Sequence, residues 1–176
     1  MFGKSFVSTA VIALGLGILG TGGAAQAQTP TLIKTTDSWG AYSYKAGGNT
    51  VCYALSVPLE GSAMPKQLDH GDVYFMVRKR TDGSVSFEPQ FMAGYLLQEK
   101  SRVTVTIGDR SFSLFTKEKS AWVDIGKPDV EAALIAAMRG GNTMTVKAVS
   151  LRGNNTSYTY SLKGVTAALN TVKNCK

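Results

Sequence analysis

The sequence predicts an all-β protein: mainly an antiparallel β-sandwich or barrel-like sheet, with one or two short peripheral helices. Three observations predict this class. Short stretches alternate apolar and polar residues, turn-forming residues separate them about every ten residues, and only two stretches carry an apolar period of helical type.

The first half of the predicted sheet covers residues 38–92. We expect strands at 38–44, 51–58, 72–80 and 84–92, with a loop over 60–71 that is rich in turn-forming residues. Hairpin turns are indicated by Gly47-Gly48-Asn49 and by Asp82-Gly83. Within the stretch 72–80 both faces are apolar through the middle, which is typical of a central strand. Pro89 indicates a bulge or an edge.

The second half contains more strands and both helices. Strands are expected at 102–108, 110–116, 120–123, 143–152 and 156–163, with turns at Gly108-Asp109 and at Gly153-Asn154-Asn155. A helix is expected to begin near Pro128 and to end at Gly140-Gly141. Its apolar stripe, and that of a weaker second helix, have members three or four residues apart: Val130, Ala133, Leu134, Ala137 and Met138, then Val165, Ala168, Leu169 and Val172.

The N-terminus has the pattern of a secretory signal peptide over residues 1–27. Lys4 precedes a short apolar run, and Ala25-Gln26-Ala27 offers a cleavage site. We expect residues 28–176 to form a single exported domain without an integral membrane span. The predicted location is the periplasm, with outer-membrane association or secretion left open.

The two cysteines, Cys52 and Cys175, both lie in the exported part. An even number of cysteines in an oxidising compartment predicts one disulfide between them. A metal or redox pair is the alternative, but the chain lacks the Cys-x-x-Cys spacing that it would need.

Charge indicates a preference for anionic partners. Removing the signal peptide takes away Lys4 and leaves 18 basic against 12 acidic residues, a net charge of +6. Anionic lipids, lipopolysaccharide and acidic glycans are favoured by this charge, whereas nucleic acid is disfavoured by export. A candidate anion-contacting surface comprises Arg78, Lys79, Arg80, Lys117 and Lys119. The alternative is that these cations are solvated strand ends that also block edge-to-edge aggregation.

A metal site is not expected at the only histidine. Asp69-His70-x-Asp72 could supply two carboxylates and an imidazole, but no other histidine or free cysteine is expected to complete a zinc site. We therefore predict a solvated turn histidine, no metal and no cofactor.

Catalytic residues are not predicted either. The sequence contains no Gly-x-Ser-x-Gly, Ser-x-x-Lys or His-Glu-x-x-His pattern. A hydrolase that uses a pair of carboxylates remains an alternative. Its candidates are Asp72, Glu88, Glu99, Asp109, Glu118, Asp124 and Glu131.

Paired aromatic residues suggest a further alternative, a small-ligand carrier with a pocket between sheets. Tyr42 and Tyr44 share one face of their strand, and Tyr158 and Tyr160 share one face of theirs. Most strand aromatics should lie in the core, but one of these pairs could be exposed and contact a ligand.

Seven segments and a terminal cysteine, in their order and spacing, carry a resemblance to a known family: "SWGAYSY", "VCYALSVP", "GDVYFMVRKR", "VTVTIG", "FSLFTKEKSAWV", "AALIAAMRGGNTMTVKAVSLRG" and "TYSLKGVTAAL". The mature chain resembles the invasion-associated locus B (IalB) family of exported alphaproteobacterial proteins. The resemblance implies an envelope or periplasmic β-sandwich, a link to host-cell entry in pathogens, and no catalytic activity or cofactor. The leading hypothesis is an exported, non-enzymatic envelope protein that binds a protein, a glycan or an anionic envelope component.

Overall fold

The computed structural model of the chain describes residues 29–80, 87–124 and 126–176. The predicted signal peptide and the predicted turn at Asp82-Gly83 lie outside these residues. The described residues form ten strands and two helices: β1 (Thr31–Thr36), β2 (Trp39–Ala46), β3 (Asn49–Ser56), β4 (Tyr74–Lys79), β5 (Phe87–Met92), β6 (Arg102–Ile107), β7 (Arg110–Lys117), β8 (Ser120–Trp122), α1 (Pro128–Gly140), β9 (Thr143–Val149), β10 (Asn155–Ser161) and α2 (Val165–Asn174).

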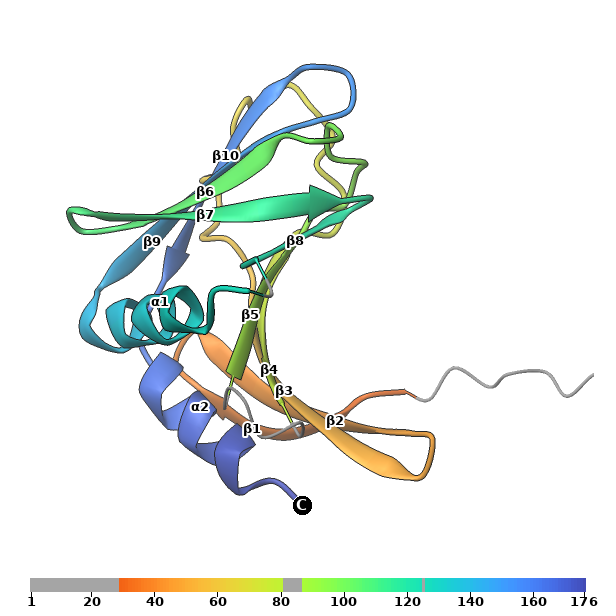
Figure 1. Cartoon of the computed structure of the whole chain (residues 1–176), viewed down its shortest axis with the longest axis vertical. Helices are drawn as coiled ribbons and strands as arrows, with labels where there is room; N and C mark the ends of the chain where they lie inside the picture. The colour runs from red at the N-terminus through yellow and green to blue at the C-terminus, as the bar shows by residue number, and fades with distance from the viewer. Residues whose placement is uncertain (1–28, 81–86, 125) are drawn as a thin grey trace, which may run out of the picture.

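All ten strands belong to one antiparallel sheet, in the order β1-β2-β3-β4-β5-β8-β7-β6-β9-β10. The sheet is open, since β1 and β10 are its two ends and do not pair with each other. Figure 1 shows that it bends strongly, so that β1–β3 diverge from β7, β6, β9 and β10, while β4, β5 and β8 connect the two parts. The all-β, antiparallel prediction is therefore confirmed, together with the two short helices.

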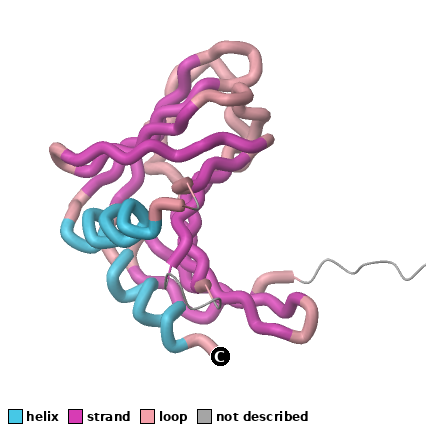
Figure 2. Tube along the Cα trace, viewed as in Figure 1, coloured by secondary structure: helices cyan, strands magenta, loops and turns pink. Residues whose placement is uncertain are grey.

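Both helices lie on the same side of the bent sheet, in the opening between its two halves (Figure 2). The helix α2 packs against β1 to β4, and α1 packs against β5 and β7. Every member of the predicted α2 stripe is buried, whereas Val130 and Ala133 of the α1 stripe are only partly buried. The buried face of α1 also includes Glu131 and Ile135, which the prediction left out.

Strand β4 is a central strand, as predicted, because it pairs with β3 on one side and β5 on the other. Only one of its faces is fully buried. Phe75 and Val77 have no exposed surface, while Tyr74 and Met76 are half-buried on the opposite face. The helices and the other half of the sheet thus cover the inner face of the sheet, and the outer face is turned towards solvent.

Strand β1 is absent from the prediction. Its sequence, Thr31 to Thr36, is exposed along almost its whole length, so it shows no alternation of buried and exposed residues. It forms at the edge of the sheet, where β2 is its paired strand.

The opposite edge of the sheet, at β10, is covered by the predicted loop. The amide of Leu59 donates to the carbonyl oxygen of Thr159 at 2.7 Å, and Met64 and Ser157 exchange two backbone hydrogen bonds of 2.9 and 3.0 Å. This pairing satisfies backbone groups that would otherwise invite association with another strand.

Candidate functional site

A hydrogen-bonded chain of side chains runs from the loop 57–72 into the core. His70 Nε2 donates to the carbonyl oxygen of Pro65 at 2.9 Å, and His70 Nδ1 lies 2.7 Å from the Tyr158 hydroxyl. That hydroxyl lies 2.9 Å from the hydroxyl of Tyr95, which is 2.6 Å from Thr156 Oγ1. Thr156 in turn donates to the carbonyl oxygen of Ala148 at 3.2 Å. We call His70, Tyr95, Thr156 and Tyr158 the His70 network.

The number of hydrogens available for donation limits how many contacts of the His70 network are hydrogen bonds. With a neutral imidazole, its four members supply one hydrogen each, whereas the chain contains five contacts. One of the five contacts therefore lacks a hydrogen, so a neutral imidazole leaves the chain one hydrogen bond short.

Burial holds the core tyrosines in their neutral form. Desolvation, followed by the hydrogen bond with Tyr95, raises the pKa of Tyr158 far above its usual value. Desolvation also raises the pKa of Tyr160, whose hydroxyl has no hydrogen-bond partner among the described residues. Both side chains are fully buried on the inner face of β10.

A pocket of about 510 Å³ opens beside the His70 network. It combines apolar side chains with a few polar groups, a mixture common in small-ligand sites, and its volume lies in their usual range. Its lining residues are Leu68, Asp69, His70, Tyr95, Leu96, Ser150, Leu151, Arg152, Asn154 and Thr156.

The prediction of a solvated turn histidine is wrong. Both ring nitrogens of His70 are within hydrogen-bond distance of protein atoms, and the side chain is half-buried. Its neighbour Asp69 accepts a hydrogen bond from the amide of Gly71 at 2.9 Å, which shapes the turn. In the part of the chain that the structure describes, no three histidine, cysteine, aspartate or glutamate residues are grouped so as to hold a metal ion.

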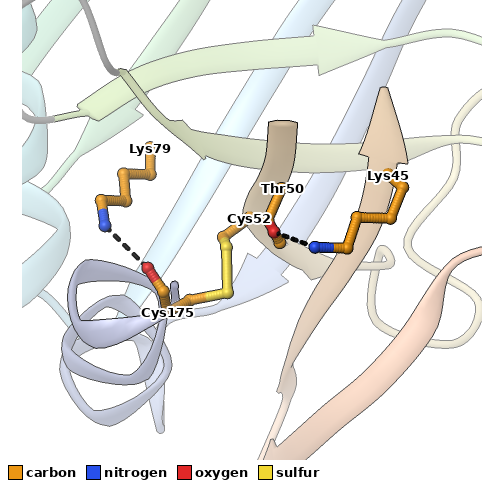
Figure 3. The surroundings of a disulfide bond; sticks show 5 residues. All are labelled: Lys45, Thr50, Cys52, Lys79 and Cys175. Atoms are coloured by element: carbon orange, nitrogen blue, oxygen red, sulfur yellow. Dashed lines mark hydrogen bonds between the residues drawn. A yellow bond between two sulfur atoms is a disulfide. The ribbon is translucent and has the colours of Figure 1, made fainter. Parts of the chain in front are cut away.

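The predicted disulfide is present and joins Cys52 of β3 to Cys175, the residue that follows α2, with a Cα–Cα distance of 6.3 Å (Figure 3). Lys79 lies at the same place, because its Nζ donates to the carbonyl oxygen of Cys175 at 2.8 Å. A cation in this position also interacts favourably with the negative end of the helix dipole. Lys79 therefore has a structural role at the C-terminal end of α2.

The other two cations of the predicted anion-contacting surface on β4 and just after it also have protein partners. Arg78 forms an ion pair with Glu88 of the neighbouring strand. Arg80 lies 3.5 Å from Glu131 of α1 and 4.0 Å from Glu88. These contacts account for much of the positive charge of residues 78–80 within the fold.

The structure does not bring Lys117 and Lys119 close to that group. Arg78 pairs with Glu88 near the start of β5, whereas Lys117 pairs with Ser120, which lies opposite Met92 at the other end of β5. Four residues of extended strand separate the two groups by roughly 13 Å. The five cations therefore form two separate groups, and their contact with anions stays a prediction.

The alternative of a hydrolase needs a pair of carboxylates. Where carboxylates lie close to one another in the described residues, cations lie beside them. Glu88 and Glu131 lie on Arg80, as described above. Asp124 lines a pocket of about 530 Å³ together with Asp129, which was not among the predicted carboxylates. Hydrogen bonding from Arg102 and Lys127 keeps the pKa of Asp124 below its usual value. A glycosidase needs one carboxyl that stays protonated, and Asp124 is held in the opposite state.

The two predicted aromatic pairs differ in burial. Tyr158 and Tyr160 are buried, while Tyr42 and Tyr44 are half-buried on the outer face of β2. There Tyr53 stacks on Tyr42, with ring centroids 5.5 Å apart, and meets Tyr44 edge-on at 6.1 Å. Desolvation raises the pKa of Tyr53. A shallow apolar pocket of about 320 Å³ adjoins them, lined by Pro30, Tyr44, Tyr53, Leu55, Tyr74, Met76 and Met92.

Sequence reasoning missed the His70 network and the Arg80–Glu131 pair. The network joins residues up to 88 positions apart, so no local spacing indicates it. Glu131 does give a signal, since it falls at a position of α1 that turns towards the core, where an ionised side chain needs a partner.

The fold and these sites define a class of protein: an open, bent antiparallel sheet with two helices on its inner side and a disulfide from the third strand to the C-terminal end. The chain belongs to the invasion associated locus B (IalB) family, whose model matches residues 39–173. A similar solved structure is the crystal structure of invasion associated protein b from Bartonella henselae, with a TM-score of 0.57 and 14% sequence identity. The similarity covers 81% of this chain and 95% of that chain. The sequence matches none of the curated proteins with which it was compared.

No helix in the described residues is long and apolar enough to cross a membrane.

Proposed function

We propose that this chain acts after export, in the cell envelope, as a non-catalytic module that binds a partner there. The observation that carries the proposal is the bond between Cys52 and Cys175, because structural disulfides persist in oxidising compartments such as the periplasm. The signal-peptide pattern of residues 1–27 and membership of the IalB family support it further.

Surface chemistry supports binding as the activity. The exported chain has a net charge of +6, and its outer sheet face exposes both aromatic and polar side chains. Such a surface favours association with anionic components of the envelope, in a manner that weakens as salt screens the charges.

Export is tested by separating periplasm from cytoplasm and membranes after expression of the full chain. We expect the periplasmic form to begin at Gln28 and to carry the disulfide, as seen by mass spectrometry without reduction. A full-length chain with free thiols in the cytoplasm would contradict the proposal.

Binding is tested by cross-linking the exported chain in intact cells and identifying what is captured at low and high salt. A partner whose capture falls at high salt supports the proposal. If no envelope component is enriched over a control exported protein of equal charge, the binding role is wrong.

The name of the solved neighbour, invasion associated protein b, supports an extension: in a pathogen, the module contributes to entry into host cells. A deletion strain that enters cultured cells as well as its parent would remove this extension and leave the binding role untouched.

A second function is favoured by the pocket of about 510 Å³ beside the His70 network, namely carriage of a small ligand. Native mass spectrometry of protein isolated from the periplasm tests it. A bound mass that is lost when Leu151→Arg obstructs the pocket supports carriage, and an unliganded protein contradicts it.

A further inference from the structure

The outer face of β7, β6, β9 and β10 differs from the rest of the surface, because its side chains form two polar rows across the strands. Strand register places one residue of each strand in each row. The first row is Ser111, Thr106, Thr145 and Thr159, and the second row is Ser113, Thr104, Lys147 and Ser157. We call these eight residues the hydroxyl face.

The polar groups of this face are largely unused by the fold. Thr106 Oγ1 and Ser111 Oγ lie 3.0 Å apart, and no other side chain of the hydroxyl face has a hydrogen-bond partner among the described residues. Their donors and acceptors therefore remain available to solvent or to a ligand, repeated at the strand spacing of about 4.8 Å.

An aromatic pair borders the hydroxyl face. Phe115 of β7 and Trp122 of β8 are half-buried, with ring centroids 5.6 Å apart. Polar residues flank them on both sides, since Gln90 lies opposite Trp122 and Arg102 lies opposite Phe115. Apolar ring surface beside an amide and a guanidinium suits a ligand with apolar and hydroxyl-bearing faces.

Two pockets and two cations complete the arrangement. Pockets of about 510 and 530 Å³ lie along this part of the molecule, and Arg102 lines both. Asp124 and Asp129 line the second pocket, so the first, which Lys147 also lines, is the one that suits an acidic ligand. The Arg102 side chain is 49% exposed and binds Asp124 at 3.0 and 3.3 Å through one nitrogen, Nη1. Lys147 is exposed at the centre of the second row.

We propose that the hydroxyl face is a binding site for an extended acidic glycan. This inference rests on the proposed function and specifies its partner. Serine and threonine hydroxyls exchange hydrogen bonds with sugar hydroxyls along the strand-to-strand rows. Trp122 and Phe115 contact the apolar side of a sugar ring, and Lys147 and Arg102 attract its carboxylates.

A protein partner fits this face less well, because the centre of a protein interface is built from large apolar residues rather than rows of short hydroxyl side chains. The apolar surface around Tyr42, Tyr53 and Tyr74, on the other half of the sheet, has that composition instead. The two surfaces therefore call for different ligands.

The test measures binding of the disulfide-intact exported chain to polygalacturonate, with neutral dextran as the uncharged glycan, by affinity electrophoresis. We expect polygalacturonate to bind more tightly than dextran and to weaken above about 0.15 M salt. Lys147→Thr should lower the affinity by about fivefold to tenfold, whereas Lys173→Thr, which removes the same charge from α2, should change it less than about twofold.

A second pair of variants tests the hydroxyl groups without changing charge. Thr104→Val with Thr145→Val keeps β-branched side chains on the strands but removes two hydroxyls. We expect weaker binding from this variant and unchanged binding from Thr31→Val with Thr35→Val, which alters exposed threonines of β1. Circular dichroism and thermal unfolding verify that all variants fold.

Three results would overturn the inference: no binding of polygalacturonate at low salt, equal losses from Lys147→Thr and Lys173→Thr, or no effect of the paired valine substitutions. If any of them occurs while cross-linking still captures a salt-sensitive envelope partner, the glycan site is wrong and the proposed function stands. If neither glycan nor envelope partner is found, both are wrong.

Discussion

The two halves of the sheet, β1–β5 and β6–β10, have similar inner faces and different outer faces. Inward positions of both halves are apolar and buried, for example Phe75 and Val77 of β4 and Val103 and Val105 of β6. Outward positions carry tyrosine and methionine in the first half but serine and threonine in the second. The inner alternation specifies the fold, whereas the two halves differ in the chemistry of their outer faces.

The halves also differ in what secures them. In the first half, a covalent bond fastens Cys52 of β3 to the end of α2. In the second half, the His70 network fastens the loop 57–72 to β10 without a covalent link. We therefore expect substitutions in the first half to lower the free energy of unfolding more than comparable substitutions in the second half.

The largest effect is expected from removing the disulfide. Cys52→Ser with Cys175→Ser opens a link that spans 123 residues, and the free energy of unfolding should fall by about 3–5 kcal/mol. Urea unfolding of the variant and of the reduced wild type measures it. A loss below that of Tyr158→Phe, described below, would contradict the comparison between the halves.

Gly164 tests the junction at which β10 leads into α2. Its φ is +90°, and a Cβ there would lie 2.1 Å from the carbonyl oxygen of Thr36 on β1. Gly164→Ala should therefore cost about 2–3 kcal/mol of unfolding free energy, through strain and displacement of β1. Gly140→Ala, at a site where the added methyl group meets no atom within 4 Å, is the matched control and should cost nothing. Equal thermal midpoints for the two variants would show that the close approach to Thr36 is tolerated.

The parts of the molecule that could be predicted are those in which neighbouring residues carry the signal. The α2 stripe of Val165, Ala168, Leu169 and Val172 is predicted in full, because each member faces the same core. The disulfide is predicted because only two cysteines exist. Strand β1 could not be predicted, since an exposed edge strand has no buried face to impose alternation.

The candidate sites depend on contacts between distant segments, and sequence patterns do not reveal these. From the sequence, Arg80 is one of three consecutive cations at a strand end, whereas in the structure Glu131 of α1 lies beside it. His70 reads as a turn residue until β10 places Tyr158 beside it. The hydroxyl face emerges only from the register of four strands, although each strand already shows its own alternation.

A moderate effect is expected from Tyr158→Phe in the second half. The substitution removes a buried hydroxyl that contacts both His70 and Tyr95, and should lower the unfolding free energy by about 1–3 kcal/mol. Urea unfolding at neutral pH measures it. The His70 ring should also lose its fixed orientation, which NMR of its two carbon-bound protons can follow. An unchanged spectrum and stability would show that the network does not secure the loop.

The smallest effect is expected from Tyr160→Phe, two residues further along β10. Its hydroxyl is buried without a partner among the described residues, so its removal at neutral pH should leave stability unchanged or raise it by up to about 1 kcal/mol.

Tyr158 and Tyr160 should make the free energy of unfolding depend on pH in the alkaline range. Burial raises the pKa of Tyr158 and of Tyr160, so the folded state favours the neutral phenols. Their stabilising effect is complete below the unfolded-state pKa of about 10 and falls as the pH rises above it, because the unfolded chain then loses protons that the folded chain keeps. Each tyrosine can contribute up to about 1.4 kcal/mol per pH unit to this decline. Tyr160→Phe should therefore reduce the alkaline slope of the unfolding free energy while leaving the neutral value intact. An alkaline slope equal to that of the wild type would mean that Tyr160 ionises in the folded protein, and hence that β10 is less tightly closed over the core than its burial indicates.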